Sequence, residues 1–77
     1  MNDKTRTEIG KIISEIHALV TKIVDVHDEE QGKYDNMPEG LQQGENGEKM
    51  NQAIEDLSSA ESSLEEAISY LDAATTD

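Results

Sequence analysis

The sequence predicts an all-α fold: an antiparallel two-helix hairpin that dimerises into a four-helix bundle. Two segments repeat apolar side chains at intervals of three and four, which is the period of one helical face. The residues between them include the only proline and three of the five glycines, so we expect the chain to turn there. These observations predict a single helical domain over residues 1–77, with a helix at about 6–30, a connector at 31–46 and a helix at about 47–74.

The first helix has an unusually wide apolar face. In a heptad frame, position a holds Ile9, Ile16 and Ile23, position d holds Ile12, Leu19 and Val26, and position e holds Ile13, Val20 and His27. The Thr5-Arg6-Thr7-Glu8 segment has capping-box spacing and predicts where the helix starts. One partner helix cannot cover a face of this width. We therefore expect self-association through Ile9, Ile12, Ile13, Ile16, Leu19, Val20 and Ile23 here, together with Leu57, Leu64 and Leu71 of the second helix.

The connector is predicted to close one end of the hairpin. We expect Tyr34, Met37 and Leu41 to cover the helix ends in a short turn, with one helical turn beginning at Pro38.

The chain has no cysteine that could form a disulfide, and small hydrophobic cores commonly need a further stabilising constraint. Self-association would supply that constraint, which is the second reason for expecting a homodimer.

The second helix has a stricter repeat. Position a holds Met50, Leu57, Leu64 and Leu71, position d holds Ala53, Ala60, Ala67 and Ala74, and position e adds Ile54 and Ile68. Asn46 is suited to cap its start. Alanine at every d position predicts a Leu/Ala seam, in which two backbones approach to about 8–10 Å or closer.

Charge and motif content exclude several classes of function. The net charge is −12, and residues 28–77 account for all of it, with fourteen acidic and two basic side chains. Direct nucleic-acid binding and an anionic membrane surface are therefore not expected. The longest apolar run is three residues, which predicts no membrane span and a cytoplasmic protein. His17 and His27 do not share a helical face, and no metal, cofactor or catalytic motif is present, so we expect no enzyme.

The acidic side chains of the second helix allow two interpretations. One is a solvated face that serves solubility. The other is a phosphate-like array, with carboxylates about 5–10 Å apart along a rigid rod, that binds the basic channel of a nucleic-acid-handling protein. The candidate partner-binding residues are Glu45, Glu48, Glu55, Asp56, Glu61, Glu65, Glu66 and Asp72.

The connector carries a resemblance to known sequences. Residues 28–57 contain Tyr-Asp-Asn-Met-Pro-Glu at 34–39, Leu41-Gln42 and Gly-Glu-Lys-Met at 47–50. This stretch resembles short acidic uncharacterised proteins encoded by bacteriophages and other mobile elements. The resemblance implies a phage setting in the host bacterial cytoplasm and raises the hypothesis of an inhibitor of host defence, including CRISPR effectors. The alternative is a structural or assembly module of the mobile element.

Overall fold

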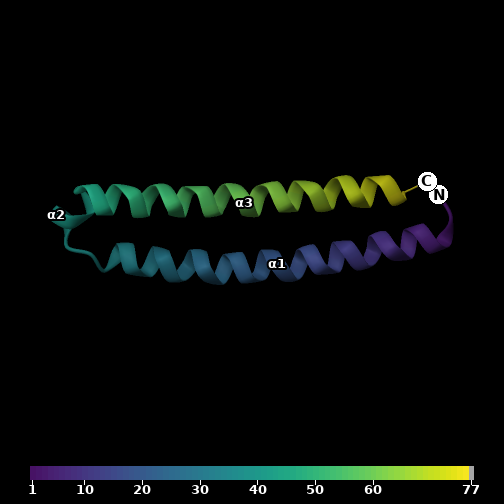
Figure 1. Ribbon diagram of the computed structural model, residues 1–77, viewed down its shortest axis with the longest axis horizontal. Coiled ribbons are helices and arrows are strands. Elements are labelled where there is room, and N and C mark those ends of the chain that lie inside the picture. The colour runs from purple at the N-terminus through teal and green to yellow at the C-terminus, as the bar shows by residue number, and fades with distance from the viewer. Residues whose placement is uncertain (77) are drawn as a thin grey trace.

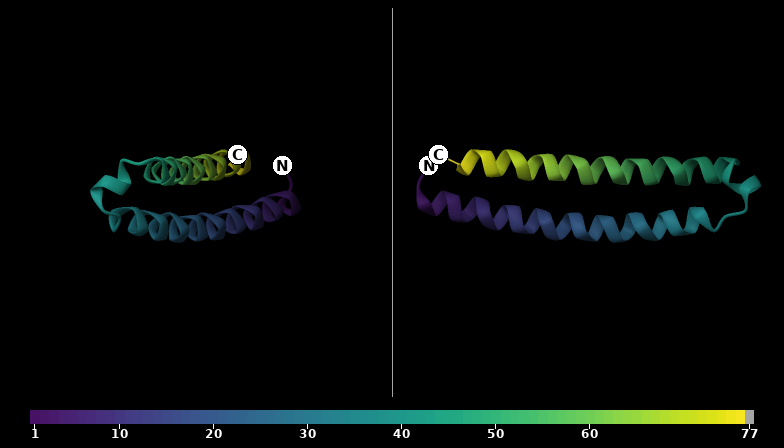
Figure 2. Two further views of the ribbon diagram at one scale, coloured as in Figure 1. Left: turned by 60° about the vertical axis from the view of Figure 1, so that its left-hand side comes forward. Right: turned by 180° about the vertical axis from the view of Figure 1, so that it is seen from behind.

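The chain folds into two long helices that run side by side in opposite directions, as the computed structural model shows (Figure 1). The structure describes residues 1–76. The helix α1 spans Asp3–Asp35, the one-turn helix α2 spans Glu39–Gln42, and α3 spans Glu45–Thr75. The molecule measures 58 × 15 × 12 Å, with both termini at the end opposite α2 (Figure 2). The predicted all-α hairpin is confirmed, and no helix in the described part is long and apolar enough to cross a membrane.

Both long helices extend beyond their predicted bounds because their ends are capped differently. Asn2 caps α1, and its side-chain oxygen accepts a hydrogen bond of 2.9 Å from the Thr5 backbone N–H. The predicted capping box at Thr5 is therefore wrong. At the other end, the Asn36 N–H donates to the Gly32 carbonyl at 3.1 Å, and the Gln42 side-chain amide donates to the Tyr34 carbonyl at 2.7 Å. These bonds satisfy carbonyls that a helix C-terminus leaves free.

The connector is compact because most of it is helical. Pro38 occupies the N-cap of α2, close to the predicted start of a helical turn. Gly44 caps α3, so the prediction of Asn46 as its cap is wrong. Gly47, in the first turn of α3, is buried, and a Cβ there would lie closer than 3.0 Å to the carbonyl oxygens of Leu41 and Gln42. Glycine at 47 thus lets α2 fold down onto the start of α3.

The two helices meet along a seam formed by heptad positions a and e. Only Ile54 and Ile68 are buried among the hydrophobic residues, at 5% and 7% exposure, and both are e positions. Most of the covered side chains recur at alternating intervals of four and three residues; Val24 and Ala67, beside this series, are half-buried as well. The seam consists of Ile9, Ile13, Ile16, Val20, Ile23, His27, Glu30 and Tyr34 on α1, and of Gly47, Met50, Ile54, Leu57, Glu61, Leu64, Ile68, Leu71 and Thr75 on α3.

The alanine half of the predicted Leu/Ala seam is wrong. Ala53, Ala60 and Ala74 are exposed, and Ala67 is only half-buried. Isoleucine at position e removes more apolar area from water than alanine at position d, which favours the seam that the structure has.

Most of the residues predicted to associate with a second copy lie in the seam of a single chain. Eight of the ten are half-buried between α1 and α3, while Ile12 and Leu19 are exposed. The eight are Ile9, Ile13, Ile16, Val20, Ile23, Leu57, Leu64 and Leu71. In this structure they hold the hairpin together.

Candidate functional site: the acidic surface of α3

Seven of the eight predicted partner-binding residues form one exposed surface. They occupy heptad positions b, c, f and g of α3, none of which belongs to the a/e seam. We call this set the acidic surface: Glu45, Glu48, Glu55, Asp56, Glu65, Glu66 and Asp72, all exposed.

The acidic surface has little cationic compensation. Lys49 is the only basic residue of α3, and its ammonium lies 3.2 Å from Glu45. Two other carboxylates accept neutral donors, because Gln52 donates to Asp56 at 3.0 Å and the Tyr70 hydroxyl donates to Glu66 at 3.4 Å. Within the described residues the remaining carboxylates make no ion pair. The surface therefore presents a field of one sign along the helix.

Glu61, the eighth predicted residue, does not belong to this surface. It occupies position e in the seam and is half-buried. Its Oε1 atom is sealed from solvent and accepts no hydrogen bond from the residues that the structure describes. Position e lies nearer the a/d seam that the sequence favoured than the positions of the other seven candidates do; with the seam at a and e, Glu61 becomes part of the seam itself.

One polar arrangement links α1 and α3 and was not foreseen from the sequence. Ser58 Oγ and His27 Nε2 share a hydrogen bond of 3.1 Å, whose direction follows the imidazole tautomer. His27 Nδ1 lies 3.6 Å from Asp28 Oδ1. The arrangement ties the two helices together. No spacing in the sequence predicts this contact, because the register between α1 and α3 decides which residues of the two helices lie opposite each other.

A cluster of charges stabilises the end of α1. Lys33 Nζ donates to Glu30 Oε1 at 3.0 Å and lies 3.9 Å from Glu29 Oε1. The hydrogen bond to Glu30, followed by the negative charges of Glu30 and Glu29, raises the pKa of Lys33. Lys33 belongs to the segment that was predicted to begin the connector and that forms the last turns of α1.

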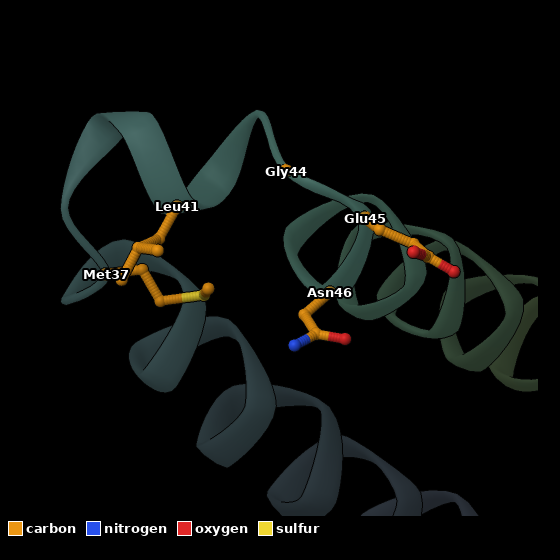
Figure 3. Close-up of a pocket in the computed structure, with 5 residues that line it drawn as sticks. All are labelled: Met37, Leu41, Gly44, Glu45 and Asn46. Atoms are coloured by element: carbon orange, nitrogen blue, oxygen red, sulfur yellow. The ribbon is translucent and has the colours of Figure 1, made fainter.

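A hollow of about 280 Å³ lies where α2 meets α3. Met37 and Leu41 form one side, and Asn46 reaches toward it from α3 (Figure 3). Gly44 and Glu45 complete the lining. The hollow is small for an organic ligand, since ligand pockets commonly measure about 300–1,000 Å³.

The described residues contain no group of three or more histidine or carboxylate side chains placed to hold a metal ion. Comparison with protein-family models, with curated proteins and with solved structures finds no match for the chain.

Proposed function

We propose that this chain is a small interaction protein that binds and inhibits a nucleic-acid-binding protein through the acidic surface of α3. The observation that supports the proposal is the exposure of seven carboxylates on one 31-residue helix that carries a single lysine. A straight helix of that length is about 46 Å long and repeats negative charge at intervals comparable to those of backbone phosphates. A basic channel that accepts a nucleic acid would attract such a rod.

The setting proposed for this activity is a bacterial cell that carries a phage or another mobile element. It follows from the resemblance of residues 28–57 to small acidic proteins of such elements. The partner class is then a host nucleic-acid-handling protein, such as a CRISPR or other defence effector. The acidic chain contacts the partner's protein surface, and no direct contact with nucleic acid is required.

Dimerisation into a four-helix bundle also belongs to the proposal. It is supported by the aliphatic side chains that remain exposed on α1 after the hairpin forms. This observation also favours the second candidate function, a structural or assembly module of the mobile element. In that case the acidic surface serves only solubility.

Binding to a candidate partner tests the first function. The labelled chain is used to capture proteins from host lysate, and affinity for a captured nucleic-acid-binding protein is then measured against salt and against competing DNA or RNA. Affinity is expected to fall steeply between about 50 and 500 mM salt, as the Debye length shrinks to a few ångströms. Nucleic acid and this chain are expected to exclude each other.

A charge-reversal pair makes the test specific for α3. The Glu65→Lys and Glu66→Lys double variant is expected to abolish inhibition while keeping its helicity, because both side chains are exposed. The matched control reverses Asp25 and Glu39, which are exposed on α1 and α2, with the same change in net charge. Equal inhibition by both double variants and the parent would reject the acidic-surface mechanism and favour the assembly module.

A further inference from the structure

A line of large aliphatic side chains remains exposed on α1. Ile12, Leu19 and Val26 are 44%, 49% and 49% exposed. Because they recur every seven residues, they follow one face of the helix over about 20 Å at ~1.5 Å per residue. Singly exposed aliphatic residues are ordinary, but an aligned set is typical of an interface.

The small side chains of α3 flank this line on the same side of the hairpin. In both helices position d lies beside the a/e seam, and the alanines at d of α3 are exposed except Ala67, which is half-buried. The two helices are right-handed, run in opposite directions and face each other through the same heptad positions. The d positions of α1 and the d positions of α3 therefore lie on the same side of the pair. We call the resulting surface the apolar face: Ile12, Leu19, Val26, Ala53, Ala60, Ala67 and Ala74. No carboxylate occupies a d position of α3.

We propose that the apolar face binds a second copy of this chain, with the two α1 helices antiparallel about a twofold axis at Leu19. Such an interface is self-complementary. Ile12 and Val26 each lie seven residues from Leu19, so the axis pairs each with the other and Leu19 with itself. The alanines of α3 allow its backbone to approach the second hairpin closely. This inference rests on the proposed self-association and is independent of the proposed acidic-surface partner.

The charges beside the line favour this orientation. Glu15 and Lys22 both occupy position g, both are exposed, and neither forms an ion pair within the described residues. In antiparallel helices g faces g, so the axis at Leu19 brings Glu15 of each copy beside Lys22 of the other near the centre, and Glu8 beside Glu29 toward the exposed ends, two opposite-charge and two like-charge pairs. A parallel pairing would instead place Glu15 beside Glu15 and Lys22 beside Lys22.

The distribution of charge between the helices supports contact through α1. Residues 1–27, which include Ile12, Leu19 and Val26, contain four basic and four acidic side chains, so this part of α1 meets its copy with little net repulsion; residues 28–35 add four acidic and one basic side chain at the end of the helix. The acidic surface lies on the outer side of α3 and stays exposed in the dimer. A second copy is therefore an occupant that the α1 half of the apolar face can accept without pairing like charges at its centre.

A single substitution tests the face. Leu19→Asp places a charge in the interface, and its dimer dissociation constant, measured by sedimentation equilibrium, is expected to rise about 100-fold or more. Its circular dichroism should remain helical, because Leu19 lies outside the seam. The matched control is Leu41→Asp at α2, where the parent leucine is 59% exposed, and it is expected to dimerise like the parent. A monomeric parent, or a dimer that tolerates Leu19→Asp, would overturn the proposal.

Charge exchange tests the twofold register without touching apolar residues. Glu15→Lys and Lys22→Glu are each expected to weaken their own homodimer about tenfold, because two exposed pairs change from opposite to like charges. Mixing the two variants should restore parent-like affinity as a heterodimer, detected by native mass spectrometry with one isotope-labelled variant. Statistical mixing with no preference for the heterodimer would refute the axis at Leu19. Neither variant alters the acidic surface, so failure here is distinguishable from loss of partner inhibition.

Discussion

Replacement of Glu61 by leucine is expected to stabilise the hairpin by about 2 kcal/mol. Glu61 Oε1 is buried in the seam without a hydrogen bond from the described residues, and an unsatisfied buried polar atom costs about 1–3 kcal/mol. Leucine adds apolar contact worth up to about 1.5–3 kcal/mol, of which the stem of the glutamate already supplies part. A gain of about 2 kcal/mol corresponds to a melting temperature about 10 °C higher in a chain of this size.

Thermal unfolding followed by circular dichroism measures this effect. All variants are compared at one protein concentration, because self-association alone shifts the melting temperature. Glu65→Leu, at an exposed position of the same helix, is the matched control and should change stability by no more than about 0.5 kcal/mol. A melting temperature for Glu61→Leu at or below that of the parent would refute the assignment of Glu61 to the seam.

Three further predictions concern the helix ends and the link across the seam. Gly47→Ala should destabilise the fold by about 1–3 kcal/mol, because the added Cβ would clash with α2. Gly10→Ala is the matched control: its added Cβ meets no other atom, and the substitution should stabilise the fold by up to about 1 kcal/mol. A higher melting temperature for Gly47→Ala than for Gly10→Ala would contradict this. Ser58→Ala removes a hydrogen bond worth about 1 kcal/mol, so its melting temperature should fall below that of Ser59→Ala, which gains helix propensity without that loss. A hydrogen bond to Glu30 and ion pairs with Glu30 and Glu29 raise the pKa of Lys33 above its ordinary value of 10.5. These ion pairs therefore stabilise the folded chain fully below pH 10.5, and the stabilisation is lost as the pH rises through the raised pKa. Alkaline titration followed by circular dichroism should reduce helicity more in the parent than in Lys33→Gln.

The heptad repeats predicted both helices and their antiparallel order, but they did not determine the seam. The a/d and the a/e pairs both alternate intervals of three and four residues, so periodicity alone cannot choose between them. The unbroken alanine series at d favoured the first choice. The structure adopts the second because Ile54 and Ile68 bury larger side chains, even though this choice also buries part of Glu61.

The same choice explains how far the candidate site was predictable. Exposure of the acidic surface was expected from its b, c, f and g positions, none of which belongs to the seam in either case. Glu61 at e was the one partner-binding residue whose placement depended on which seam forms. Gly47 shows a second limit of prediction from the sequence. Position 47 requires glycine because α2 folds onto the start of α3, and no local sequence pattern indicates that these two segments approach each other.

The position of the seam also decides whether the two proposed interactions can occur together. If a and d had formed the seam, Ile12, Leu19 and Val26 would lie inside the hairpin, and the wide face of α1 would offer a second copy only its e positions. With a and e in the seam, the d positions of both helices are free on one side, while the carboxylates of α3 follow its outer side. A dimer built on the apolar face would then carry two acidic surfaces, one on each hairpin, and each would remain accessible to a basic partner. Multivalent binding of this kind strengthens attachment only when both surfaces can reach their sites at once. A partner with two basic sites should therefore bind the parent more tightly than it binds Leu19→Asp, whereas a partner with one site should bind both equally.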